Sequence, residues 1–241
     1  MKALLLFLTT IMLLPAAPAA ESIHISLAAQ ESFVALPVII DLKEFITNAL
    51  KKENIVVTFV PLPVTRGTSL ADKGELDGEM IRDKESIEGF SNLITSTHPL
   101  AVVHFKAVYL KSNTKFKHEN MKDFRCGTLL NNRQVQAKLE ADKIKCLEFK
   151  SPMQTFQLVK AGRIDYVLLA NEIIDGFFER NPSWKEIYVI DEKPYTDMRL
   201  YLVLNKKRAD LIPVIEKALR AAIKSELPKY KRLQQGINKN F

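Results

Sequence analysis

Hydrophobic and polar positions repeat along this chain with two periods, which predict an ordered succession of strands and helices. Alternating or continuously apolar runs predict strands at 23–27, 54–60, 76–81, 101–110, 124–129, 144–149, 164–170, 188–190 and 198–204. Apolar residues spaced three and four apart predict helices at 36–50, 68–73, 135–141, 153–161, 172–179 and 211–223. Pro61 and Pro63 are expected to end the strand at 54–60, because proline cannot donate to a strand ladder.

Strands that alternate with helices of this length indicate βαβ units and parallel pairing, and so an α/β fold. Two such blocks are joined by the two long β runs. This layout predicts one lobe from residues 20–108 plus 199–241 and a second lobe from 109–198, with hinges near 109–112 and 194–198. Ligands of open α/β sheets bind beyond the carboxyl ends of the strands. A cleft between the facing lobes is therefore the expected ligand site.

The N-terminus has the pattern of a secretory signal peptide. Lys2 is followed by an apolar run over residues 3–14 and by an Ala-x-Ala site at 17–19. The run is too short to cross a bilayer, which takes about 20 apolar residues. We therefore expect residues 1–19 to be a signal peptide and the remaining chain to be a soluble periplasmic protein.

Composition narrows the class of partner. The chain has 241 residues, of which 47% are hydrophobic and 26% charged, and this is the balance of a globular protein rather than a disordered one. The formal charge of +7 resides in the segment 206–241, with ten basic and three acidic residues, while the rest is balanced. A basic C-terminal segment is best interpreted as a solvated helix face. Export and the lack of a recognisable motif argue against nucleic-acid binding.

The two cysteines would be exported to an oxidising compartment, where thiols are more often paired than free. Cys126 and Cys146 each lie in a predicted strand. A disulfide requires neighbouring strands with Cα atoms within about 7 Å, and two buried free thiols are the alternative. The four His residues are scattered, and no cluster has the spacing of a metal site, so no metal or other cofactor is predicted.

Four stretches carry a resemblance to a known family. They are LADKGELDG at 70–78, FRCGT at 124–128, KAGRID at 160–165 and LYLVLNK at 200–206. In this order and spacing they resemble the type II periplasmic solute-binding proteins, in particular the amino-acid-type branch named extracellular solute-binding protein family 3. The resemblance implies a two-lobed α/β fold, with two mixed, mostly parallel sheets, a cleft between the lobes and two hinge crossings.

Two of these stretches contain a Gly–x–x–Asp turn. Gly74 and Gly162 are expected to end helices in left-handed geometry. Asp77 and Asp165 would then lie at the start of the following strands and cap nearby backbone amides. We expect a structural role for both carboxylates rather than ligand contact.

The resemblance also implies a first-lobe arginine that clamps a ligand carboxylate through its planar guanidinium. The usual place holds no Arg here, and the nearest candidates are Arg82 and Arg66. Ser96 and Thr97 occupy the position of a family segment whose hydroxyls and amides bind the ligand. Phe33 follows the first strand, where relatives often place an aromatic wall, although an ordinary core position is the alternative.

The second lobe offers fewer matches. Asn131 precedes a predicted helix, whose free amides favour an anion. The acidic residue that pairs with a ligand ammonium in the family corresponds here to Asn171, followed one position late by Glu172. This departure counts against an α-amino-acid ligand, and Glu79 is an alternative negative partner.

The resemblance implies a non-enzymatic function, in which a monomer captures a small polar solute, amino-acid-like or an organic anion, by hinge closure. The partner would be a membrane permease of the ABC transporter type or a sensor protein. The missing arginine leaves a second interpretation, a signalling module on the same fold that has lost its ligand. A third is a dehydratase-type enzyme, for which Glu79 and His98 are the available acid–base groups.

Overall fold

The computed structural model describes residues 21–130 and 133–241. The predicted signal peptide and Asn131 lie outside these residues. Within the described part of the chain, no helix is both long enough and apolar enough to span a membrane.

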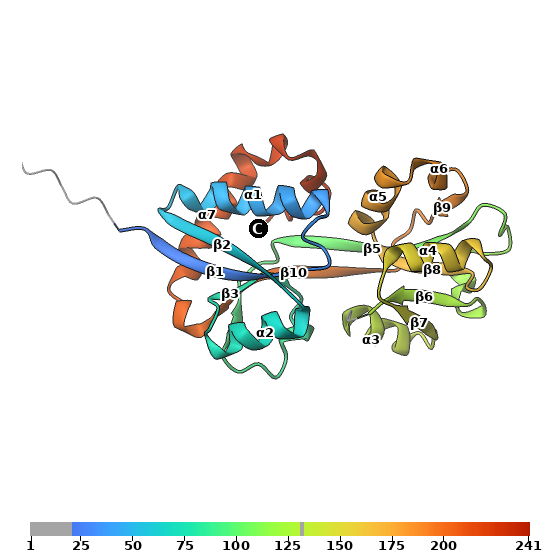
Figure 1. The fold of residues 1–241 in the computed structure, drawn as a ribbon, viewed down its shortest axis with the longest axis horizontal. Coiled ribbons are helices and arrows are strands. Elements are labelled where there is room, and N and C mark those ends of the chain that lie inside the picture. Colours follow the sequence, from blue (N-terminus) through green and yellow to red (C-terminus); the bar gives the residue numbers. More distant parts are fainter. Residues whose placement is uncertain (1–20, 131–132) are drawn as a thin grey trace, which may run out of the picture.

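The chain forms two α/β halves that are connected by two long strands (Figure 1). The first half contains β1 (Ile23–Gln30), α1 (Pro37–Lys51), β2 (Ile55–Leu62), α2 (Val64–Lys73), β3 (Gly78–Arg82), β4 (Leu93–Thr95) and, after the return, α7 (Leu211–Ser225). The second half contains β6 (Cys126–Leu129), α3 (Arg133–Ala141), β7 (Cys146–Phe149), α4 (Pro152–Lys160), β8 (Tyr166–Ala170), α5 (Asn171–Arg180), α6 (Pro182–Lys185) and β9 (Tyr188–Ile190). The connecting strands are β5 (Ala101–Leu110) and β10 (Thr196–Asn205).

The strands follow the order β2-β1-β3-β10-β5-β8-β6-β7. Within each half the strands joined by helices are parallel, as in β1 with β2 and β3, and β6 with β7 and β8. The connecting strand β10 runs antiparallel to both β3 and β5. Because β10 pairs with strands of both halves, it joins the two parts of the sheet into one continuous path.

Most predicted elements are found within a few residues of their predicted limits, and the differences have local causes. Pro61 does not end its strand, because β2 lies at the edge of the sheet, where a residue without an N–H is tolerated. Helix α2 begins at Val64 rather than at 68, directly after Pro63 in extended geometry. The three-residue strand β4 and the single-turn helix α6 were not predicted.

The amphipathic helices bury their apolar faces as their spacing predicts. Helix α1 buries Leu42, Phe45, Ile46, Ala49 and Leu50, and it packs against α7. Fully burying one such side chain contributes about 1.5–3 kcal/mol, so this face accounts for a large part of the stability of the first half.

The core of the second half contains a cluster of aromatic rings. Phe156 stacks on Phe177 with ring centroids 3.8 Å apart, and the hydroxyl of Tyr188 donates to the carbonyl of Phe156 at 2.6 Å. Cys126 and Cys146 are opposite each other on β6 and β7, with Cα atoms 4.4 Å apart, and are joined by a disulfide. This is the paired one of the two arrangements that the sequence left open.

Candidate functional site

A cavity of about 190 Å³ lies between the two halves and is lined by residues of both. Its floor is formed by Ala101, Val103 and Phe105, which are alternate residues of β5 and therefore point to the same face of the strand. The walls come from α1 and β3 of the first half and from β8 and α5 of the second. The site is thus at the expected place, between the facing halves of the fold.

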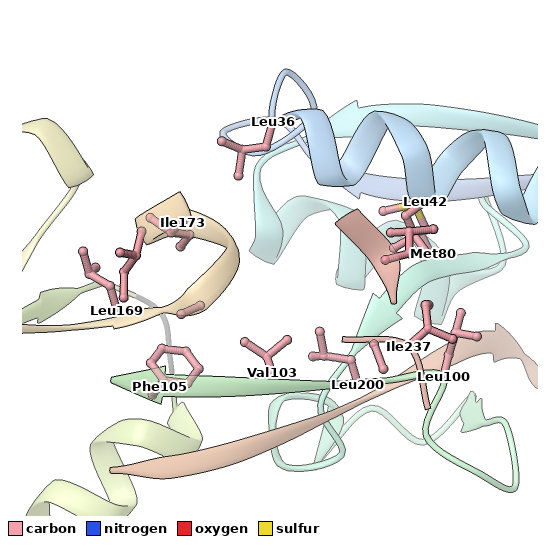
Figure 2. Packing of buried hydrophobic residues seen from close by; sticks show 14 of the residues in the cluster. Leu36, Leu42, Met80, Leu100, Val103, Phe105, Leu169, Ile173, Leu200 and Ile237 are labelled. Carbon is pink, nitrogen blue, oxygen red and sulfur yellow. The ribbon is translucent and has the colours of Figure 1, made fainter. Parts of the chain in front are cut away.

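The walls of this cavity are mainly aliphatic (Figure 2). Leu42 and Met80 contribute from the first half, and Leu169 and Ile173 approach from the second. Leu36, which precedes α1, lies against the second half, where its Cδ2 is 3.5 Å from the position that a Cβ on Gly176 would take. Such a lining favours a ligand with an apolar body.

Glu79 brings a buried carboxyl group into this apolar lining. It lies on β3, is 6% exposed, and its Oε1 has no hydrogen-bond partner. Burial raises the pKa of Glu79, while the nearby Arg82 guanidinium and the Thr68 hydroxyl oppose this shift. An unpaired carboxyl oxygen in such a position costs free energy unless a ligand donates to it.

Arg82 ends the same strand and also lines the cavity. Its Nε lies 3.9 Å from Oε2 of Glu79, too far for a hydrogen bond, and this buried Nε has no other partner. The neighbouring Asp83 lines the cavity too, and its Oδ1 accepts a hydrogen bond from the amide of Ser86 at 2.8 Å. The guanidinium therefore has one carboxylate of its own strand, that of Glu79, within 4 Å.

Glu172 supplies a third carboxylate, from the first turn of α5 in the second half. Its Oε2 is buried without a hydrogen-bond partner, and burial raises its pKa. Its Oε1 is 3.1 Å from the position that a Cβ on Gly236 would take. The resemblance aligned the acidic position of the family with Asn171, one residue before Glu172. In the structure Glu172 lines the cavity and Asn171 does not.

The C-terminal segment closes one side of the cavity and was not foreseen from the sequence. The amide of Val102 donates to the carbonyl of Gly236 at 2.7 Å, and Ile237 forms a bridge with Ala101. Gly236 and Ile237 both line the cavity. This segment has neither period-two nor helical patterning, so its apolar Ile237 gave no signal of its location.

The other candidates are distributed unequally around the cavity. Phe33 lines it together with Glu79 and Arg82. Outside the lining are Arg66, Ser96, Thr97 and Asn171. Arg66 is exposed on α2, and the buried Ser96 hydroxyl donates to the carbonyl of His98 at 2.8 Å. The amide of the exposed Thr97 donates to the Glu216 carboxylate.

The described lining of this cavity is poor in the side chains that most often act as nucleophiles or metal ligands. Among the described residues that line the cavity there is no His, Cys, Ser, Thr, Lys or Tyr. Nor does the described part of the chain bring together three or more side chains that could hold a metal ion. The polar side chains of the lining are carboxylates, guanidinium groups and the Gln30 amide, and the charged ones bind charged ligands through hydrogen bonds.

No family model and no curated protein sequence matches this chain. Solved structures do match it. An ancestral arginine-binding protein bound to arginine is 20% identical with a TM-score of 0.66, covering 88% of this chain and 96% of that one. The GluR0 ligand-binding core in complex with L-glutamate is 11% identical with a TM-score of 0.71, covering 90% and 99%. A histidine kinase sensor domain with similarity to periplasmic binding proteins is 13% identical with a TM-score of 0.68, covering 90% and 97%.

At these identities the likeness concerns the fold. The three structures match nearly the whole of the described chain, from the first half through the connecting strands to the second. The chain has the two-lobed α/β fold of the type II periplasmic binding proteins, as its sequence resemblance implied.

Proposed function

We propose that this protein is an exported solute receptor, in which the two lobes close around a small solute and the closed form is recognised by a membrane permease or a sensor protein. The lobes are residues 20–108 plus 199–241 and residues 109–198, and closure bends the chain near 109–112 and 194–198. The receptor acts as a monomer and performs no chemistry on the solute.

The observation that carries this proposal is the cavity lined from both halves, in which one buried carboxyl oxygen of Glu79 has no hydrogen-bond partner within a mainly apolar lining. Buried polar groups without partners are rare in proteins and are typical of sites that await a ligand. The structural neighbours support the same function, because their names describe arginine and glutamate ligands and a kinase sensor domain.

Ligand binding can be tested by a thermal-shift screen with amino acids, amines, organic acids and sugars. A ligand present at a hundredfold excess over its Kd stabilises the folded state by about 2.7 kcal/mol. For each hit, small-angle X-ray scattering should show a smaller radius of gyration, because closure brings the lobes together. A screen in which no compound raises the melting temperature would overturn the proposal in favour of a module without a ligand.

A matched pair of variants locates the binding site. Val103→Phe fills the cavity from its floor and should abolish the stabilisation by a hit. Val102→Phe is the control, because residue 102 lies on the same strand, points to the opposite face and is outside the lining. Equal loss of binding in both variants would contradict a site in this cavity.

A further inference from the structure

The charges in the cavity between the lobes do not balance. The charged residues in its described lining are Glu79, Asp83, Glu172, Arg82 and Arg232. Arg232 points its guanidinium to other partners, with Nη1 3.4 Å from Oδ2 of Asp41 and Nε 3.7 Å from Oε1 of Glu179. The cavity itself is therefore left with three carboxylates and one guanidinium.

Arg82 cannot compensate all three carboxylates. It is 3.9 Å from Oε2 of Glu79 and adjacent in sequence to Asp83, both on its own side of the cavity. Glu172 lies on the opposite lobe, where the partly exposed imidazole of His104 opposes the rise of its pKa. His104 is already paired with Asp197, at 2.6 Å from Nδ1 to Oδ1.

In each of the carboxyls of Glu79 and Glu172, one oxygen has no hydrogen-bond donor. Oε1 of Glu79 and Oε2 of Glu172 are both buried without partners. A ligand that satisfies them must carry N–H or O–H donors, and a cationic donor gains the larger free energy because its charge complements the carboxylate.

The register of the connecting strands separates these two acids along the cavity. Glu79 is opposite Val203 on β10. Glu172 packs against Gly236, whose carbonyl is bound by Val102, and Val102 is opposite Arg199 of β10. The two attachment points are thus four residue steps apart on β10, a distance of about 13 Å along the strand. Aliphatic side chains such as Val103 and Leu200 line the intervening space.

We infer that the solute is an aliphatic dication without a carboxylate, such as a diamine or an aminoalkyl guanidine, with one cationic end at Glu79 and the other at Glu172. This inference rests on the proposed function and names its ligand class. An α-amino acid fits less well, because its carboxylate would share a small cavity with three protein carboxylates and one guanidinium, and this guanidinium already lies 3.9 Å from the Glu79 carboxylate.

Pairs of compounds that differ by one carboxylate test the inference on the unmodified protein. Isothermal titration calorimetry would compare agmatine with arginine and cadaverine with lysine. We expect each decarboxylated compound to bind at least tenfold more tightly than its amino acid. Arginine or lysine binding as tightly as its amine, or more tightly, would overturn the inference and leave the receptor function standing. No binding by any compound of the wider screen would instead overturn the receptor function.

The second cationic end is tested by pentylamine, which matches cadaverine in chain length but has one amine. We expect cadaverine to bind at least tenfold more tightly. Equal affinities of the two compounds would overturn the assignment of a separate acid to each end of the ligand.

Neutral variants assign the two acids. Glu79→Gln and Glu172→Gln keep the shape of the side chain, and each should weaken agmatine binding at least tenfold. Glu186→Gln is the control, because Glu186 is exposed on the second lobe and lies outside the cavity. Circular dichroism confirms that each variant is folded before titration. Unchanged agmatine affinity in both cavity variants would overturn the inference.

Discussion

The two halves of the protein repeat one motif, in which three parallel strands alternate with two helices. In the first half the strands have the order β2-β1-β3, and in the second half β7-β6-β8. In each motif the strand that comes first in the sequence therefore lies in the centre, and the strand that comes second lies at the edge. The halves differ in how this edge strand is held.

In the first half the edge strand is held by a long pairing with the central strand, and in the second half a short pairing is supplemented by a disulfide. Strands β1 and β2 are eight residues long, whereas β6 and β7 have four each. The shorter pair is closed at its first register position by the disulfide between Cys126 and Cys146. A short strand pair makes few hydrogen bonds, so a link that restricts the unfolded chain adds proportionally more.

The same contrast is found in the turns before β3 and β8. Gly74 and Gly162 both adopt left-handed geometry, with φ of 75° and 65°, as the sequence predicted. Asp77 then accepts hydrogen bonds from the amide and hydroxyl of Ser26, and Asp165 accepts one from the amide of Arg125. Both acids thus bind a backbone amide of the central segment of their half, Asp77 within β1 and Asp165 directly before β6.

The arginine that completes each cap comes from a different distance along the chain. Asp77 accepts from Nε of Arg208 at 2.6 Å, and Arg208 follows the returning strand β10. Asp165 is held by Nε and Nη2 of Arg125, which immediately precedes β6. The first turn therefore fastens the returning chain to the first lobe, while the second turn fastens its own lobe only.

The largest expected difference between the halves concerns two glycines in their sheets. A Cβ on Gly78 would overlap the backbone carbonyl of Val203 and lie 2.9 Å from Cα of Leu204. Gly78→Ala should therefore force β3 and β10 apart and lower the free energy of unfolding by more than about 3 kcal/mol. Urea denaturation measures this change.

Gly127, on the central strand β6, is the glycine available for comparison in the described strands of the second half. Its Cβ would lie 2.6 Å from Cδ1 of Ile164 and 3.1 Å from Cε2 of Phe149, which are ends of side chains that can rotate. Gly127→Ala should cost about 1–2 kcal/mol. Equal decreases in the free energy of unfolding of the two variants would contradict this difference. They would show that the backbone of β3 and β10 adjusts to an added methyl group as readily as the side chains around Gly127 do.

Removal of the disulfide is the next largest effect. The double variant Cys126→Ala/Cys146→Ala opens a link with a sequence separation of 20 and should lower the free energy of unfolding by about 3 kcal/mol. Hydrogen exchange should accelerate for the amides of β6 and β7 and remain unchanged in β1 and β2. The wild-type protein under reducing conditions is the control and should match the variant. Faster exchange in both halves would contradict a local role of this link.

The two capping acids should differ by a smaller amount. Asp77→Asn removes a charged hydrogen bond between distant parts of the chain and should cost about 2 kcal/mol. Asp165→Asn should cost less, since its partner Arg125 is exposed and belongs to the same lobe. A greater loss from Asp165→Asn, measured by urea denaturation, would contradict the fastening role of Arg208.

The pH dependence of the same two variants tests whether the ionised carboxylates of Asp77 and Asp165 are the source of this stability. Burial raises the pKa of Asp77, but hydrogen bonds from Arg208 and Ser26 outweigh it and hold the pKa below its usual 3.8. The Arg125 guanidinium likewise holds the pKa of Asp165 below 3.8. Each carboxylate therefore stabilises the folded protein above pH 3.8, and this contribution is lost as the pH falls through the lowered pKa. Both Asn variants should show a shallower loss of stability in acid than the wild type.

The longer helices and strands could be predicted from local sequence patterns. The elements that were not predicted form because of tertiary contacts. The strand at 101–110 was predicted to the residue, because ten consecutive positions are apolar or alternate. The three residues of β4 are too short for a period and form a strand only because Val203 to Asn205 of β10 pair with them.

The candidate site was predictable where it follows the strands and not where it depends on the C-terminus. Glu79 and Arg82 could be placed near the cleft because they lie on a strand that the family resemblance locates. Gly236 and Ile237 reach the cavity through an isolated bridge to Ala101, and an isolated bridge has no repeating sequence pattern. The family position also directed attention to Asn171, although α5 turns the next residue, Glu172, toward the cavity.

The smallest expected effect contrasts the capping acids with the acids of the cavity. Burial raises the pKa of Glu172 above its usual 4.5, opposite to the shifts of Asp77 and Asp165. The folded state therefore binds this proton more tightly than the unfolded state, and the ionised group destabilises the fold increasingly as the pH rises through that window above 4.5. Glu172→Gln should consequently raise the free energy of unfolding at pH 7 by about 0.5–1 kcal/mol, the typical gain when a binding site is neutralised. Its advantage over the wild type should shrink at pH 4.5, whereas Asp165→Asn remains less stable than the wild type at both values. A loss of stability in Glu172→Gln at pH 7 would place Glu172 among the structural acids and remove the physical contrast between turn and cavity.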